Sequence, residues 1–185
     1  MHIRSILLFS LLVLMKLNLN AQSFQWAKVS GGTSDEIGNS MALLSDGSVF
    51  TAGVFNGTIA LNPGVPSNNV NSAGAQDIFI TKRDANGNFL WGARIGGSGI
   101  DSIGGMCKDD FDNIYLSGFY TGTVDFNPGG NTYLMSSVGS TDNFIVKLNA
   151  SGQFQWAKSF GGADYEERSE EHTSELQSPC NLVCR

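Results

Sequence analysis

Short runs of aromatic and β-branched residues, separated by turn residues, occupy most of the chain. This pattern predicts a succession of β-strands. In the first half of the chain the expected strands are Asn39–Leu44, Ser48–Phe55, Asp77–Arg83 and Asn88–Ile95. Asp46-Gly47 and Asn86-Gly87 join consecutive strands and are typical of type I′ hairpins, in which both central residues take a positive φ.

Several of these strands carry apolar side chains on both faces. A sheet with one wet face alternates apolar and polar residues, so apolar side chains on both faces predict sheets packed between neighbouring sheets. The residues concerned are Val49, Phe50, Val54 and Phe55, and later Ile114, Tyr115, Leu116, Phe119 and Tyr120.

The strand pattern repeats with a period of 65 residues, which is the spacing between Trp26, Trp91 and Trp156. The same shift superposes Asn62-Pro63-Gly64 on Asn127-Pro128-Gly129 without a gap. It also superposes FQWAKVSGG, FLWGARIGG and FQWAKSFGG, which begin at Phe24, Phe89 and Phe154. An internal repeat of this length predicts a repeat architecture in which one packing solution is reused.

The repeats predict an all-β fold of β-propeller-like, antiparallel four-stranded blades, with about two blades present. A β-solenoid or another β repeat is the alternative. Residues 22–38 are expected to form an orphan first strand (Phe24–Val29) and a lead-in, residues 39–103 the first blade, and residues 104–167 the second blade and the start of a third repeat. The extra segment Asn56–Ala75 explains a unit longer than the ~40–50 residues of a usual blade.

Three pieces of each unit resemble the seven-bladed β-propeller repeat family (SBBP) of exported bacterial proteins. They are the Gly-Thr-x-x-x-Asn-Pro-Gly stretch from Gly57 and Gly122, the Asp-x-Phe-Ile-x-Lys strand from Asp77 and Asp142, and the Trp-containing run ending in Gly-Gly. The resemblance covers Phe24 to Asp164. It implies a repeat scaffold and export, and these motifs carry no enzymatic signature.

The two ends of the chain differ from the repeats. Residues 1–21 combine a basic start, an apolar run of ten residues and a small residue before Gln22, which predicts a cleavable signal peptide. The apolar run is about half of the ~20 residues that a bilayer requires, so no membrane span is expected after cleavage. Residues 168–185 resemble a translated sequencing adapter and are interpreted as a non-native tail.

The composition argues against several classes of function. The net charge of -6 and the scattered basic residues argue against nucleic acid as a partner. His2 lies in the signal and His172, Cys180 and Cys184 lie in the tail, which leaves only Cys107. Without histidine, no Ser-His-Asp or Cys-His catalytic pair and no zinc site is expected. The site residues, metal and cofactors are therefore predicted to be none, and Cys107 is expected to be a small buried residue.

Four other features have a structural and a functional interpretation. The oxygen-rich run Asp109, Asp110, Asp112 and Asn113 lacks EF-hand spacing and is interpreted as a polar turn rather than a calcium loop. Asp77 and Asp142 are expected to close Asx turns. The three tryptophans are expected to occupy equivalent, largely buried sites. Glu166 and Glu167 form a carboxylate pair only if the native continuation supports one.

The expected function is a secreted or cell-surface scaffold that binds a protein or glycan and is not an enzyme. The alternative is part of a secreted propeller enzyme, of a glycan-degrading type, whose site lies elsewhere. Further blades of the full-length chain are the other expected partners. Two blades alone leave apolar faces unpaired, so we expect a marginally stable chain that tends to associate.

Overall fold

A computed structural model describes residues 24–162. The predicted signal peptide, the adapter-like tail and the pair Glu166 and Glu167 lie outside the described residues. The strands are β1 (Gly31–Gly32), β2 (Glu36–Leu43), β3 (Val49–Phe55), β4 (Thr58–Ala60), β5 (Asn69–Asn71), β6 (Asp77–Arg83), β7 (Phe89–Gly97), β8 (Asp101–Lys108), β9 (Ile114–Tyr120), β10 (Thr123–Asp125), β11 (Leu134–Ser136), β12 (Asp142–Leu148) and β13 (Phe154–Phe160). A 3₁₀ turn, Pro66–Asn68, precedes β5.

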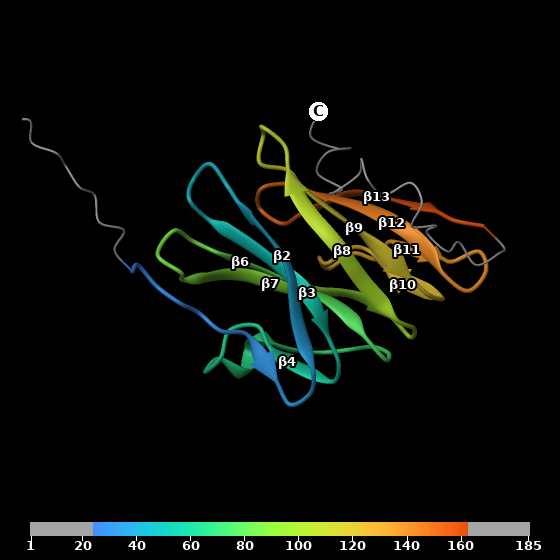
Figure 1. Ribbon diagram of the computed structural model, residues 1–185, viewed down its shortest axis with the longest axis horizontal. Helices are drawn as coiled ribbons and strands as arrows, with labels where there is room; N and C mark the ends of the chain where they lie inside the picture. The colour runs from blue at the N-terminus through green and yellow to red at the C-terminus, as the bar shows by residue number, and fades with distance from the viewer. Residues whose placement is uncertain (1–23, 163–185) are drawn as a thin grey trace, which may run out of the picture.

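The strands form two antiparallel meanders that pack face to face (Figure 1). Blade 1 has the order β7-β6-β3-β2, and blade 2 has the order β13-β12-β9-β8. Each inner pair keeps one register along its whole length, as between Val49↔Arg83 and Phe55↔Asp77. The fold is therefore all-β with propeller-like four-stranded blades, as the sequence predicts, and the sheets do not close into a ring.

The hairpin turns differ from the predicted type I′ turns. In the first, Gly47 N donates to Leu44 O at 3.0 Å and Leu44 N donates to Ser48 O at 2.8 Å. Gly47 has a φ of 79° but Asp46 is not in the positive-φ region, and the turn around Asn86-Gly87 is built in the same way. These are type I turns followed by a left-handed residue, so the type I′ prediction was wrong. The observed loop fits the sequence because only one of its residues, the glycine, takes a positive φ.

The extra segment of each unit connects neighbouring repeats. Strand β7 serves as the outer strand of blade 1, and its last residues, Gly96 and Gly97, pair with β10 of the second repeat. β10 pairs in turn with β11, which extends the sheet of blade 1 to six strands. In the first repeat Gly31 and Gly32 pair with β4 in the same way. The segment is thus a clamp between units rather than a passive insertion.

The main core lies between the two blades. Alternate side chains of β3 and β6, including Phe50, Ala52 and Ile80, pack against β8, β9 and β12 of blade 2. A smaller cluster of Phe55, Ile59, Leu61 and Phe79 fills the other face of blade 1. Apolar side chains on both faces of these strands are therefore confirmed for blade 1. In blade 2 Phe119 is 39% exposed, because nothing in the described chain covers that side of the sheet.

Two expectations about the repeat need correction. The tryptophans are not largely buried: Trp26 and Trp91 are half-buried, and Trp156 is 37% exposed. Trp26 and Trp91 each pack on a hairpin glycine of the next unit, whereas Trp156 meets Tyr115 of its own blade, so the burial of each indole depends on a neighbouring hairpin. Phe24–Val29 is not a strand, because it has no partner strands of its own blade; instead it lies beside blade 1.

Candidate functional site

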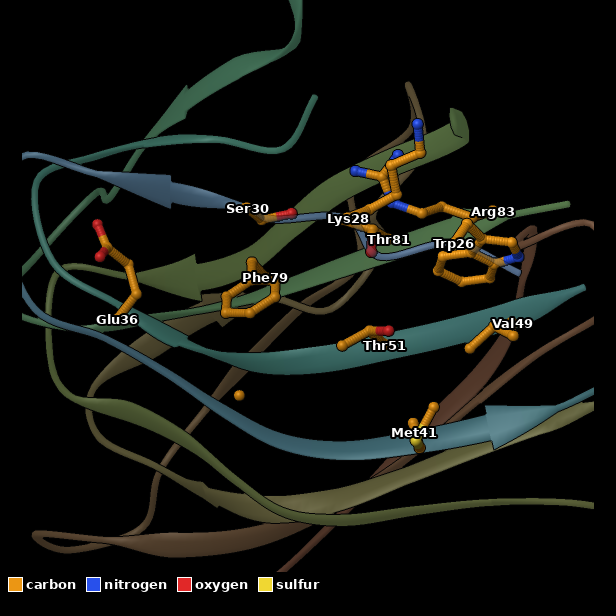
Figure 2. A pocket seen from close by; sticks show the side chains of 11 residues that line it. Trp26, Lys28, Ser30, Glu36, Met41, Val49, Thr51, Phe79, Thr81 and Arg83 are labelled. Atoms are coloured by element: carbon orange, nitrogen blue, oxygen red, sulfur yellow. The ribbon is translucent and has the colours of Figure 1, made fainter. Parts of the chain in front are cut away.

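A groove on the open face of blade 1 is the candidate site. We call it the front groove; it lies between the lead-in segment and strands β2, β3 and β6, on the side of blade 1 away from blade 2 (Figure 2). Its volume is about 340 Å³. The lining residues are Trp26, Lys28, Ser30, Glu36, Gly38, Met41, Val49, Thr51, Phe79, Thr81 and Arg83.

The period of 65 residues gives each groove residue a counterpart in the second repeat. Most of the counterparts belong to the buried core between the blades. Five of these buried apolar residues are replaced by small or polar residues in the groove. The pairs, groove residue first, are Ser30 and Ile95, Gly38 and Ile103, Thr51 and Leu116, Thr81 and Val146, and Arg83 and Leu148. The groove is therefore a polar version of the surface that blade 2 buries.

Arg83 is the most unusual of these residues. It is only 8% exposed, and its guanidinium donates to Leu61 O at 3.0 Å and to Gly87 O at 3.3 Å. The guanidinium also lies 5.5 Å from the ring centre of Phe89. Burial lowers the pKa of Arg83. Within residues 24–162 no carboxylate forms an ion pair with it, so a buried positive charge faces the groove without a counter-ion.

Glu36 and Trp26 lie at opposite ends of the groove (Figure 2). Glu36 Oε1 is buried and accepts no hydrogen bond from the described residues. Trp26 is held in place by its Nε1, which donates to Ala85 O at 2.8 Å, and by packing on Gly87. The groove thus offers a donor-rich end beside Arg83 and Lys28 and an acceptor at the other end.

A second group of polar side chains consists of three buried aspartates, one at the start of each of β6, β8 and β12. Asp77, Asp101 and Asp142 are fully or almost fully buried, and each carboxylate accepts a hydrogen bond from the backbone N–H four residues earlier, at 2.9, 2.7 and 3.1 Å. Asp77 also forms an ion pair with Arg94, at 3.2 Å. Asp77 and Asp142 therefore bond the local backbone, as predicted, but through the residue four positions earlier, so the predicted Asx turns, which use the backbone two residues later, were wrong. Asp101 is an equivalent residue that the sequence analysis missed, although the 65-residue shift aligns it with Glu36.

Burial disfavours the charged forms of Asp77 and Asp101. Burial raises the pKa of Asp77, and burial together with the nearby charge of Asp77 raises the pKa of Asp101 to about 6. One oxygen of each of these two carboxylates has no hydrogen-bond partner among the described residues. Gly96 packs so closely on Asp77 that a Cβ there would lie 2.3 Å from the carboxyl carbon, which leaves no space for a ligand on that side.

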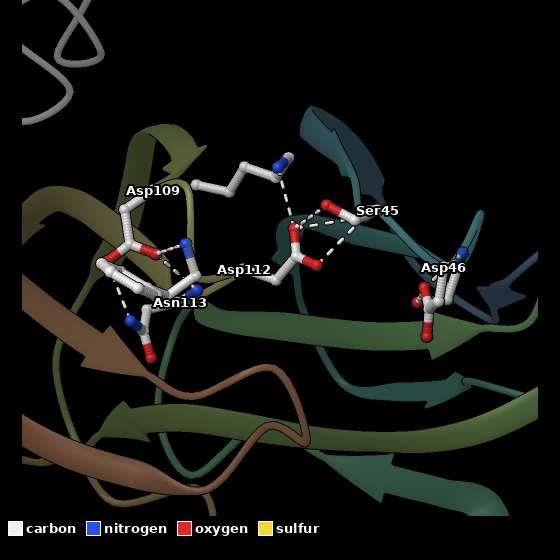
Figure 3. A network of polar contacts seen from close by, with 8 residues as sticks. Ser45, Asp46, Asp109, Asp112 and Asn113 are labelled. Atoms are coloured by element: carbon white, nitrogen blue, oxygen red, sulfur yellow. Dashed lines mark hydrogen bonds and ion pairs between the residues drawn. The ribbon is translucent and has the colours of Figure 1, made fainter.

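The aspartate-rich run forms a polar hairpin turn, as predicted (Figure 3). The Asp109 carboxylate accepts hydrogen bonds from Phe111 N, from Asn113 N and Nδ2, and from the Tyr115 hydroxyl, at 2.8–3.1 Å. Hydrogen bonds within the hairpin turn therefore satisfy the oxygens of the Asp109 carboxylate. Asp112 takes a φ of 61°, at the position where the other three blade hairpins have a glycine.

Asp112 also connects the two blades. Its carboxylate accepts hydrogen bonds from Ser45 N at 3.1 Å and Ser45 Oγ at 3.1 Å, and Lys108 Nζ lies 2.8 Å from Oδ1 (Figure 3). The ion pair and the hydrogen bond with Lys108 lower the pKa of Asp112. Asp112 therefore has a structural role that explains its unfavourable backbone conformation.

The remaining candidates add no chemistry to the groove. Cys107 lies in β8 and is 7% exposed, as expected for a small buried residue. His2, His172, Cys180 and Cys184 lie outside the described residues. From Phe24 to Gly162, no three potential metal-binding side chains come together, and no helix is long and apolar enough to cross a membrane.

Comparison with known proteins supports the architecture. The chain is 25% identical over 154 residues to an uncharacterized WD repeat-containing protein, L264, of Acanthamoeba polyphaga mimivirus. It is 28% identical over 143 residues to the regulatory protein FlaEY of Caulobacter vibrioides. These alignments cover 71% and 75% of this chain but only 11% and 14% of the two relatives. No family model matches the chain.

The repeat and the two meanders agree with the WD-repeat relative. The chain is a propeller-type β-repeat protein. The chain spans less than a sixth of the length of the curated relatives it matches.

Proposed function

We propose that this chain is a secreted or cell-surface β-propeller scaffold of the SBBP type that binds a protein or glycan ligand and catalyses no reaction itself. The observation that carries the proposal is the front groove, in which polar residues replace apolar residues of the repeat. A face meant only for packing against another blade favours apolar residues, since buried polar groups without partners are costly. The WD-repeat relative supports a scaffold for protein interaction.

Export is part of the proposal and rests on the first 21 residues. Their charged start and short apolar run favour a cleaved signal over a membrane anchor. Expression of the chain in a bacterial host, followed by N-terminal sequencing of the processed protein, tests this directly. Processing at Ala21-Gln22 is the expected result, and retention of the apolar run in the cell would contradict export.

Binding is tested by probing glycan and extracellular-protein arrays with the labelled chain. The matched control is the double variant Thr51→Leu/Thr81→Val, which installs the residues of the second repeat in the groove. Ligands that bind the natural chain and not the control identify the groove as the binding surface. The alternative, a glycan-degrading enzyme, predicts release of reducing ends from the bound glycan, and such release by the natural chain would overturn the non-catalytic part of the proposal.

A further inference from the structure

We propose that the front groove binds an acidic oligosaccharide, with Arg83 holding a sugar carboxylate and Glu36 accepting hydrogen bonds from sugar hydroxyls. This inference rests on the proposed ligand-binding function and adds to it a ligand class and a site. It depends on three features of the groove: a buried unpaired cation, a set of hydroxyl and carboxylate groups, and a limited volume.

The first feature is the buried guanidinium of Arg83. Arg83 is 8% exposed and has two backbone carbonyls but no carboxylate as partners within the described chain. Removing a charge from water without a counter-ion is strongly unfavourable. The planar guanidinium presents five N–H donors, which match the two oxygens of a carboxylate. Lys28 lines the same end of the groove and adds a second positive charge.

The other polar groups favour a sugar over an acidic peptide. Glu36 lines one end of the groove, and its carboxylate accepts hydrogen bonds, which a sugar hydroxyl donates and a peptide carboxylate does not. Along the floor Thr51 and Thr81 provide hydroxyls that donate and accept, as sugar hydroxyls also do.

The size of the groove describes the ligand. About 340 Å³ lies at the small end of the range for small-molecule pockets. Trp26 and Phe79 supply aromatic surface, and a few polar groups fix orientation, as is usual in such pockets. Arg83 pairs with Val49 and Glu36 pairs with Phe55, at the two ends of β3, so the two residues lie about 20 Å apart along the strand. A ligand that contacts both is therefore an oligosaccharide of about three or four rings, part of which lies outside the groove.

Another blade of the same protein is the competing occupant. The face that blade 1 offers to blade 2 contains Phe50, Ala52 and Val54, all apolar. A blade with a face of this kind offers no anion to Arg83 and no donor to Glu36. Such a blade would also pack against Thr51 and Thr81, whereas blade 1 packs against Leu116 and Val146 at the equivalent positions of the second repeat. The changes on this face therefore favour a polar ligand.

The test uses the 185-residue chain and a panel of short oligosaccharides of galacturonate, glucuronate and mannuronate. Each acidic oligosaccharide is paired with its methyl ester, which keeps the sugar and removes the charge. Isothermal titration is expected to show binding of at least one of the three acids. The methyl ester of that acid is expected to bind at least about tenfold more weakly than the acid, because a hydrogen-bonded ion pair is lost. No binding of any uronate, or equal binding of acid and ester, would overturn the proposal.

Variants locate the site. Arg83→Leu, which installs the residue found at position 148, is expected to weaken uronate binding about tenfold or more. The control Lys158→Met removes one positive charge from the exposed surface of β13 and is expected to leave binding unchanged. If Arg83→Leu does not fold, as judged by circular dichroism, Arg83→Lys and Thr81→Val replace it, and each is expected to weaken binding severalfold. Unchanged affinity in the folded groove variants would exclude the site.

A glutamate tripeptide and a neutral glucan separate the alternatives. Tripeptide binding as tight as uronate binding would exclude the glycan assignment. A glycan or protein that binds equally to the natural chain and to Arg83→Leu would leave the proposed scaffold function standing and remove only this site. Absence of any ligand for the natural chain on the arrays would instead remove the proposed function itself.

Discussion

Trp91 of blade 1 lies directly over Gly152 in a hairpin of blade 2. A Cβ on Gly152 would be 3.1 Å from the indole Cε3, which is closer than almost all real contacts of a Cβ atom. Trp26 packs in the same way on Gly87, one repeat earlier. The 65-residue spacing of the tryptophans therefore reflects one contact, made by each unit with the hairpin of the next.

The contact predicts that Gly152→Ala destabilises the chain for two reasons. Gly152 has a φ of 83°, which costs an alanine about 1–2 kcal/mol, and the new methyl group also displaces Trp91. Gly64→Ala is the matched control, because Gly64 has a φ of 89° and nothing within 4 Å of its Cβ position. Urea denaturation should show a larger loss for Gly152→Ala, and equal losses would mean that the indole contact contributes nothing.

The tryptophans themselves should differ in energetic importance. Trp91 packs against the core between the blades and meets Phe50 edge-on, with ring centres 6.1 Å apart. Trp156 is 37% exposed, and its own hairpin partner would lie in a further unit. We expect Trp91→Ala to cost about 3 kcal/mol and Trp156→Ala less than about 1 kcal/mol. Similar losses in denaturant titrations of the two variants would argue against the shared contact.

Asp112 gives a test of blade coupling. Asp112→Ala removes the acceptor for Ser45 and the partner of Lys108 while keeping an unfavourable φ of 61°, so the midpoint of urea unfolding should fall. Asp112→Gly loses the same contacts but relieves the backbone, so its midpoint should fall less. Asp110→Ala, at the exposed tip of the same turn, should leave the midpoint unchanged. A smaller effect for alanine than for glycine would contradict this account.

The pH dependence of stability follows from the buried aspartates. Burial raises the pKa of Asp101 to about 6 in the folded chain, above its usual value of 3.8, so the folded state binds more protons between these pH values. Stability is therefore expected to fall by about 1–2 kcal/mol as the pH rises from 4 to 6.5. The raised pKa of Asp77 acts in the same direction.

Turn aspartates act in the opposite direction at lower pH. A hydrogen bond from Ser48 lowers the pKa of Asp46, and one from Asn88 lowers the pKa of Asp84, so their stabilisation is lost as the pH falls below about 4. Maximum stability is thus expected near pH 4, where the two effects meet. Asp101→Asn should flatten the slope above pH 4 and leave the acid limb intact. An unchanged slope in thermal unfolding of this variant would show that Asp101 is not the responsible group.

Much of the fold was predictable from local sequence. The strand Asp77–Arg83 was predicted with the bounds that the structure has, because its apolar side chains occupy both faces and turn residues flank it. The 65-residue shift predicted the antiparallel units, since equal sequence at equal spacing reuses one packing solution. The polar turn at Asp109 followed from its equivalence to the hairpin after Leu44.

The front groove was not predictable in the same way, although its signal was present. Aligning Thr51 with Leu116, Thr81 with Val146 and Arg83 with Leu148 shows the change, but sequence alone does not say which face of a strand meets another blade. Only the packing of Phe50 and Ala52 against blade 2 assigns the alternate residues to the open face. Because these three polar residues then share one open face, they line a groove.

The sequence by itself determined the all-β class, the repeat and most strand positions, because periodicity and turn residues act over a few neighbouring positions. Tertiary structure decided which glycine lies under each tryptophan, which blade the clamp strands join, and how much of each indole is buried. These depend on contacts between residues about 61 positions apart, as for Trp91 and Gly152. Their geometry is set only when two sheets pack, so no local pattern encodes it.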